Sequence, residues 1–232
     1  MDYIKLGQTD VSIPRLCVGG MSFGEVFPDF HQWVIGQDET QAVIARALEL
    51  GVNFIDTANV YARGTSEEYI GESLRRLGVP REDVVLASKV FFNEGHLSRE
   101  AIEREIAGTL ERLGTDYLDL YIIHRFDYET PMEETMEALH GLVKDGRVRA
   151  LGASAMYGYQ LHNMQAIADE HGWTRFASMQ NHYNLLYRED ERELIPVAQQ
   201  YGMSLTPYSP LASGHLTRPT WDSDSVRSTT DA

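Results

Sequence analysis

Short apolar runs alternate with longer segments of helical period along most of this chain. The short runs are rich in aliphatic and β-branched residues, as buried strands are, and the longer segments carry apolar residues three or four positions apart. Strands are predicted at residues 15–20, 52–56, 83–89, 117–124, 148–154, 176–180 and 203–209. Helices are predicted at residues 39–51, 66–78, 99–114, 131–146, 159–172 and 189–202. Regular alternation of strand and helix indicates an α/β fold with a parallel sheet and right-handed crossovers.

The ends of the predicted helices carry recognisable boundary residues. A glycine follows each helix, at residues 51, 78, 114, 146, 172 and 202, where a left-handed backbone ends a helix at little cost. Three pairs near helix starts fit a capping box, in which a short polar side chain and an acid or amide three residues later satisfy free backbone amides. These pairs are Asp38 with Gln41, Thr65 with Glu68, and Thr130 with Glu133.

The strand–helix units have nearly equal spacing and show no obvious topological switch point, which favours a closed (β/α)8 TIM barrel over an open sheet. Residues 3–6 and 11–14 flank a GQTD turn and predict a hairpin that closes the bottom of the barrel. The eighth strand and the final helices are missing from the chain, so we expect a fragment or truncated form of a longer protein. Residues 1–220 are predicted to form one barrel domain, and residues 221–232 a polar, mobile tail.

The net charge, the apolar runs and the cysteine content limit which binding partners and cellular compartments we expect. The chain has 232 residues and a formal net charge of −15, which disfavours nucleic acid and anionic membranes because both are bound by clustered Lys and Arg. No run approaches the roughly 20 apolar residues of a membrane span. The single cysteine, Cys17, excludes an intramolecular disulfide, fits a reducing compartment and is predicted to be buried. We therefore expect a cytoplasmic protein, and a homo-oligomer stays open.

Four chemically active residues follow successive predicted strands. Asp56, Lys89 and His124 end the second, third and fourth strands, and Tyr61 lies on the loop after the second. Taken singly, each also fits an ordinary structural role. In a parallel barrel the strand ends converge on one mouth, where Lys89 can pair with Asp56 and relieve the cost of burying its charge. We expect the lysine to lower the pKa of Tyr61 from about 10, so that Tyr61 serves as proton donor, while His124 binds the substrate oxygen.

At this point five segments resemble the aldo-keto reductase superfamily: GVNFIDTANVY, ASKV, LDLYIIHR, MQNHYNLL and PYSPLASG, in this order. The resemblance covers essentially the whole chain to about residue 220. It implies a (β/α)8 barrel that reduces aldehydes or ketones with a nicotinamide cofactor, usually NADPH (NADP+), bound without a Rossmann fold. It also implies that Asp56, Tyr61, Lys89 and His124 form the catalytic tetrad. NADH stays open, because the segment that holds the adenosine end is not in the chain.

The same resemblance implies a cofactor site. Ser154 and Gln180 match residues that hold the carboxamide, although Ala155 stands where many relatives carry a second amide, an asparagine. Tyr208 matches the aromatic stacked on the ring; Gln180 and Tyr208 also fit a strand-end amide and a core aromatic. The remaining implied cofactor contacts are Asp56, Gly20 and Met21 after the first strand, and Ser209, Leu211, Ser213 and Gly214 near the pyrophosphate.

Substrate choice is weakly specified. Loops after different strands supply an apolar, aromatic pocket from Trp33, Phe91, Phe92, Phe126 and Tyr157, beside Tyr61, His124 and Arg125. Arg125 fits either attraction of a carboxylate-bearing substrate or a solvated cation at the mouth. No metal is expected, because the eight histidines show no ligand spacing. Two alternatives remain: a non-catalytic NADPH-binding regulatory or interaction subunit of the same fold, and a degenerate chain unable to hold cofactor.

Overall fold

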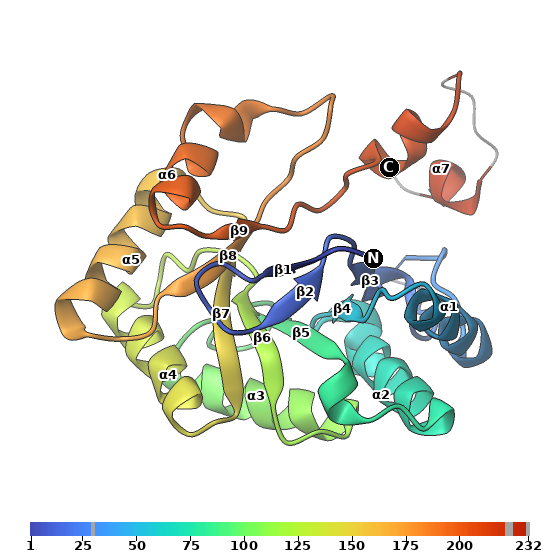
Figure 1. Cartoon of the computed structure of the whole chain (residues 1–232), viewed down its shortest axis with the longest axis horizontal. Helices are drawn as coiled ribbons and strands as arrows, with labels where there is room; N and C mark the ends of the chain where they lie inside the picture. Colours follow the sequence, from blue (N-terminus) through green and yellow to red (C-terminus); the bar gives the residue numbers. More distant parts are fainter. Residues whose placement is uncertain (29–30, 221–224, 231–232) are drawn as a thin grey trace.

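The computed structural model describes residues 1–28, 31–220 and 225–230, and contains a hairpin and a curved parallel sheet (Figure 1). The hairpin pairs β1 (Tyr3–Lys5) with β2 (Ser12–Pro14) in antiparallel fashion. The sheet has seven parallel strands in sequential order. They are β3 (Val18–Gly19), β4 (Phe54–Asp56), β5 (Val85–Val90), β6 (Leu118–Ile123), β7 (Val148–Ser154), β8 (Phe176–Gln180) and β9 (Ser204–Leu205).

Helices follow the strands and cover the outer face of the curved sheet (Figure 1). They are α1 (Gln37–Glu49), α2 (Thr65–Leu77), α3 (Arg99–Leu113), α4 (Met132–Lys144), α5 (Gly158–His171) and α6 (Leu194–Gln200), with short α7 (Val226–Thr230) near the C-terminus. This is the predicted fold class, an incomplete (β/α)8 barrel. Of the predicted tail, residues 221–224 and 231–232 lie outside the described residues.

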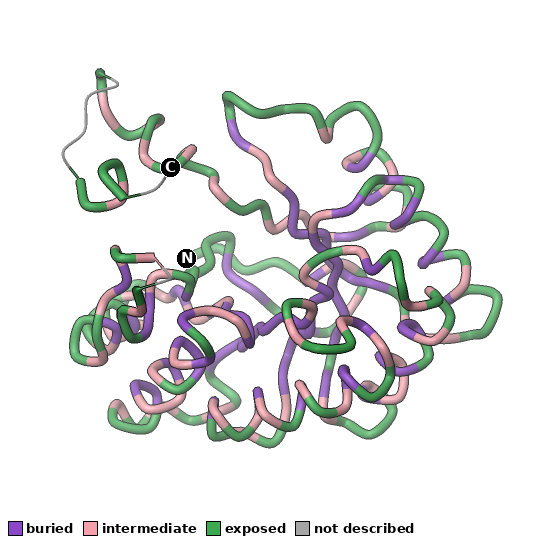
Figure 2. Tube along the Cα trace, turned by 180° about the vertical axis from the view of Figure 1, so that it is seen from behind, coloured by how far each residue is buried: buried purple, intermediate pink, exposed green. Residues whose placement is uncertain are grey.

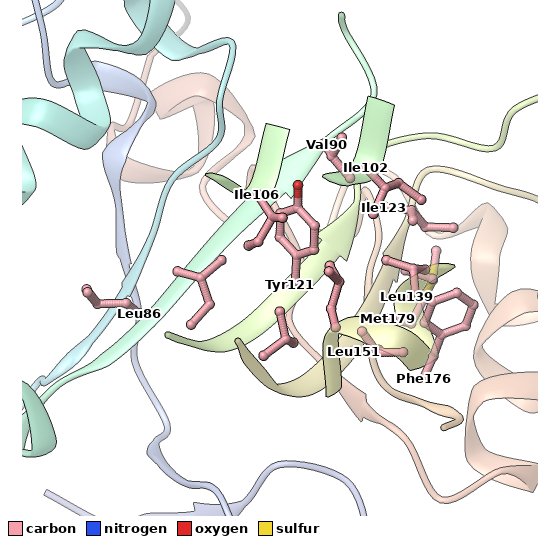
Figure 3. Packing of buried hydrophobic residues seen from close by; sticks show 14 of the residues in the cluster. Leu86, Val90, Ile102, Ile106, Tyr121, Ile123, Leu139, Leu151, Phe176 and Met179 are labelled. Atoms are coloured by element: carbon pink, nitrogen blue, oxygen red, sulfur yellow. The ribbon is translucent and has the colours of Figure 1, made fainter. Parts of the chain in front are cut away.

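Strand side chains alternate between two separate cores. On β6, Tyr121 and Ile123 pack outward against helix residues such as Ile106, as Figure 3 shows. Leu120 and Ile122 point inward and belong to the second core. Figure 2 shows the strands as mostly buried, as two-sided packing requires.

The hairpin fills the inner core at the end where the strands begin. Leu6, Val11 and Ile13 are buried against Phe54 and Val85, the first residues of β4 and β5. The turn approaches β8 closely at Gly7, which has a φ of +55° and where a Cβ atom would collide with a backbone carbonyl. The predicted plug at the bottom of the barrel is therefore present.

The predicted helix ends are confirmed, but the three predicted capping boxes are absent. All six glycines after the helices have positive φ. The N-caps of α1, α2 and α4 are Gly36, Gly64 and Pro131, and none makes a side-chain capping bond. Thr65 instead accepts a hydrogen bond from the backbone N–H of Glu25 at 2.9 Å. The Thr65 oxygen is therefore occupied by an amide from another segment of the chain and does not cap its own helix.

Cys17 is exposed, which corrects its predicted burial. It directly precedes β3, the strand at one edge of the sheet, so the described residues supply no neighbouring strand on its other side. Among the described helices, none has both the length and the apolar character that crossing a bilayer requires.

Candidate active site

The inner face of the sheet ends in polar residues at the mouth. Phe54 and Val85 belong to the inner core, and stepping by two along their strands reaches Asp56 at the end of β4 and Lys89 near the end of β5. Because the strands are parallel neighbours, both side chains point into the same end of the curved sheet. The strand period alone therefore places the acid beside the base.

Lys89 is completely buried and uses all three of its N–H donors. Its Nζ donates to Oδ1 of Asp56, to the carbonyl oxygen of Thr57 at 2.7 Å, and to the hydroxyl of Tyr61 at 3.1 Å. The Asp56 side chain is only 13% exposed, and its Oδ2 accepts from Nε2 of Gln180 at 3.0 Å. The predicted ion pair is thus present, and it holds the tyrosine hydroxyl.

Tyr61 sits at the start of a strained turn, the 3-10 segment Tyr61–Gly64. Ala62 and Arg63 have φ values of 44° and 56°, a region that non-glycine residues rarely occupy. The preceding loop is tied down, since the N–H of Asn59 donates to the carbonyl oxygen of Lys89 at 3.2 Å. The surrounding contacts therefore fix where the phenol lies.

Burial dominates the protonation of this cluster. It raises the pKa of Tyr61 above 10, and the charge of Lys89 only partly offsets that rise. The expected net lowering of the tyrosine pKa is therefore wrong. For Lys89, burial disfavours the charged form, but Asp56 and Tyr61 together outweigh it and raise the lysine pKa. At neutral pH the lysine is charged and the tyrosine keeps its proton.

His124 follows β6 and faces Tyr61. The two rings meet edge to face with centroids 5.7 Å apart, and Phe92 contacts the imidazole in the same manner at 5.0 Å. Burial, with the positive charges of Lys89 and Arg125, lowers the pKa of His124 to about 3. Its Nδ1 is buried and has no hydrogen-bond partner among the described residues. The imidazole is therefore neutral, with one donor and one acceptor.

The predicted cofactor residues lie around the same mouth. Ser154 and Gln180 end β7 and β8 as register partners, and both are buried. Tyr208 is 40% exposed and stacks on His182 with centroids 5.1 Å apart. Gly20 is buried after β3 beside the more exposed Met21, and Ser66 donates to the carbonyl oxygen of Gly20 at 2.8 Å.

The segment after Tyr208 turns tightly and carries no negative side chain. Ser209, Ser213 and Gly214 have φ values of 54°, 54° and 95°, so the backbone turns tightly there, and Leu211 is exposed. Residues 208–220 contain no acidic side chain and include His215 and Arg218. A nicotinamide dinucleotide carries a negative pyrophosphate and a carboxamide, and this loop together with the strand-end Ser154 and Gln180 fits both groups. Among the described residues, no cluster of three or more His, Cys, Asp or Glu is placed to hold a metal.

The predicted substrate residues lie in different places and do not form one pocket. Phe92 contacts His124, and Phe91 packs against the outer core and stacks on His96 at 4.7 Å. Arg125 and Phe126 line a cavity of about 360 Å³ that also reaches Tyr157 and Tyr208. Trp33 lies on the loop before α1, where it stacks on His31 at 4.4 Å and lies under Arg227.

Several contributors were not singled out from the sequence. The carbonyl of Thr57 and the loop residue Asn59 hold Lys89 and the Tyr61 loop. Glu67 of α2 is fully buried. One of its carboxylate oxygens accepts from the hydroxyl of Ser88, the neighbour of Lys89, at 2.5 Å, and the other accepts from Nε of Arg112 at 2.6 Å. Its only sequence signal is an acid on the buried face of a helix.

Comparison with known proteins gives a consistent family. The model of the Aldo/keto reductase family matches residues 15–231. An aldo-keto reductase of Fusarium vanettenii is 41% identical over 98% of this chain and 69% of its own length. The versiconal hemiacetal acetate reductase of Aspergillus parasiticus is 38% identical over 100% of this chain and 74% of its own length.

A third relative and a crystal structure are also similar to this chain. A putative aryl-alcohol dehydrogenase of Saccharomyces cerevisiae is 39% identical over 93% of this chain and 69% of its own length. The crystal structure of a thermostable aldo-keto reductase in complex with the inhibitor epalrestat has 34% sequence identity and a TM-score of 0.80, covering 91% of this chain and 74% of that one. None of these names describes a non-catalytic subunit, so that alternative finds no support. This chain spans 69% to 74% of the length of these four proteins.

Proposed function

Because this chain belongs to the aldo/keto reductase family of oxidoreductases, we propose that it reduces aldehydes or ketones to alcohols, with NADPH as hydride donor and Tyr61 as proton donor. The observation that carries this proposal is the position of Lys89 Nζ, which contacts both Asp56 and, at 3.1 Å, the hydroxyl of Tyr61. An acid whose anion is formed next to a fixed positive charge is suited to give up its proton within a reaction.

Three residues have different roles at the carbonyl oxygen of the substrate. Tyr61 holds its proton at neutral pH, since its pKa is raised, and donates that proton to the oxygen as negative charge develops there. Lys89, held charged by Asp56, stabilises the tyrosinate that remains. Neutral His124, edge to face with Tyr61, donates a hydrogen bond to the same oxygen and so fixes its position.

We also propose which residues bind the nicotinamide cofactor. Ser154 and Gln180 hold the carboxamide, Tyr208 stacks on the ring, and residues 209–214 lie along the pyrophosphate. When bound, the reduced nicotinamide supplies the hydride for the carbonyl carbon. We also propose NADPH as the preferred cofactor, and a cytoplasmic location on the ground that a single cysteine suits a reducing compartment.

The test is NADPH consumption by the purified chain with benzaldehyde, comparing wild type with Tyr61→Phe. Loss of a general acid lowers kcat by about 10²–10⁴-fold. The matched control is Tyr3→Phe on the hairpin at the other end of the strands, which removes a hydroxyl that donates to the carbonyl oxygen of Gly51 at 2.8 Å. Near-normal turnover by Tyr61→Phe would refute the assignment of the acid, and no turnover by wild type would refute reduction by this chain.

A further inference from the structure

A cavity of about 360 Å³ begins at Arg125, the residue after His124, and aromatic rings form much of its lining. Its aromatic lining consists of Phe126, Tyr128, Tyr157, His182, Tyr187 and Tyr208. A volume of this size suits a small ring compound, and flat aromatic walls favour a flat aromatic ligand. The polar side chains that line the cavity then determine which substituents on such a ligand favour its binding.

Arg125 is the cation of that lining and is exposed. Elsewhere, arginines near the sheet are paired with buried acids: Arg112 with Glu67 at 2.6 Å, and Arg149 with Asp119 at 2.9 Å. No described residue offers Arg125 a carboxylate within ion-pair distance; its guanidinium lies over the ring of Phe92, 5.6 Å from the centroid. A planar guanidinium without a partner presents its donors to a ligand.

Arg125 lies next to the proposed catalytic residue His124 and shares a neighbour with it. It follows His124 in the chain, and Phe92 contacts both side chains, with its ring centroid 5.0 Å from that of the imidazole. The positive charge of Arg125 contributes to the lowered pKa of His124 and opposes the rise in the pKa of Tyr208. Its field therefore reaches both sides of the mouth.

One acid lines the same cavity. Asp190 is half-buried, and its Oδ2 accepts a hydrogen bond from Nδ2 of Asn181 at 2.9 Å. It faces the cavity with a charge opposite to that of Arg125. The two residues are therefore expected to act in opposite directions on a charged ligand.

We propose that Arg125 selects aromatic carbonyl substrates that carry a carboxylate, with the ring against Phe126, Tyr128 and Tyr157, away from the Tyr208 wall that the cofactor covers, and the carboxylate on the guanidinium. The proposal rests on the proposed reductase function and names its substrate class. A carboxylate is favoured over a neutral substituent because it matches the paired N–H groups of a guanidinium. Asp190 weakens this preference in the wild-type chain.

The first measurement is binding, which is independent of turnover. We expect 4-formylbenzoate to bind about fivefold more tightly than its neutral counterpart 4-formylbenzamide in calorimetric titrations at low salt with saturating NADP+. The ratio of the two affinities falls to about one in Arg125→Met and is only partly kept in Arg125→Lys, which retains the charge but not the paired N–H groups. In Asp190→Asn it rises. Arg46→Met, which removes an exposed arginine from outer helix α1, is the charge-matched control and leaves the ratio unchanged.

Equal affinity for the two compounds, or no saturable binding of the carboxylate up to about 10 mM, overturns the proposal. An unchanged ratio in Arg125→Met overturns it as well. The ratio of kcat/KM for the same pair of aldehydes is the second readout. Carboxylate-selective binding without turnover contradicts the reductase function alone, whereas turnover of both aldehydes at equal efficiency contradicts the selection alone.

Discussion

The two sides of the mouth are built differently. On the side of β4 and β5, Asp56, Lys89 and Tyr61 are joined by hydrogen bonds around a lysine that is fully buried. On the side of β9, the strand has two residues, and Tyr208 beyond it is 40% exposed.

The buried side suits proton transfer and the exposed side suits cofactor binding, which are two different requirements of the same reaction. Proton transfer needs atoms held at hydrogen-bond distance, which a buried and fully paired charge provides. A large cofactor needs an open surface that it covers on binding, which a half-exposed ring provides. Substitutions on the first side should therefore change catalysis and stability together, and those on the second side should change cofactor binding alone.

The largest effect is expected from Lys89→Met. It leaves the carboxylate of Asp56 buried with only Gln180 as its described partner, so the free energy of unfolding falls by about 3–5 kcal/mol. It also removes the charge that stabilises the tyrosinate, so kcat falls by about 10²–10³-fold. Urea denaturation and NADPH consumption measure the two effects.

A double variant separates these two effects. Adding Asp56→Asn to Lys89→Met removes the orphaned charge, so stability recovers while kcat stays low. Recovery of both quantities together would show that the lysine is needed only for folding.

A pH-dependent effect is expected from His124. Its pKa is about 3 in the folded chain and about 6.5 when unfolded, so the unfolded state binds a proton first as the pH falls. Its contribution to stability is complete above pH 6.5 and is lost between pH 6.5 and about 3. Thermal unfolding should therefore show a steeper loss below pH 6.5 in wild type than in His124→Gln. Equal slopes would mean that the imidazole titrates normally.

A smaller and more selective effect is expected from Tyr208→Ala on the exposed side. Loss of the stacking surface raises the KM for NADPH by about tenfold and leaves the free energy of unfolding nearly unchanged. Tyr208→Phe, which keeps the ring, serves as the control. A fall in kcat with an unchanged KM would contradict the division between the two sides.

The smallest effect is expected from Ala155→Asn. Ala155 has a φ of 47°, a left-handed conformation that asparagine adopts more readily than alanine. The substitution also adds an amide beside Ser154, so the KM for NADPH falls about three- to fivefold through one additional hydrogen bond. A higher KM or a lower melting temperature would show that the side chain does not fit there.

Much of the fold could be predicted because it depends on local patterns. The apolar alternation located the strands, and all six terminal glycines have the positive φ that helix ends favour. The helix caps were less predictable, because some of their free amides are satisfied by distant residues. Glu193, for example, accepts from the backbone N–H groups of Gly158 and Tyr159 at 3.1 and 2.9 Å to cap α5.

The sequence by itself indicated the parallel barrel and put Asp56 and Lys89 on one face at the ends of neighbouring strands, because side chains two residues apart along a strand share a face. Only the tertiary structure decided how Tyr61 titrates and where Cys17 and Arg125 lie. Net pKa shifts and exposure depend on how many atoms from all elements surround a group, and a linear pattern does not record that packing. Burial accordingly outweighs the lysine charge at Tyr61, while Arg125 keeps its charge exposed beside the cavity.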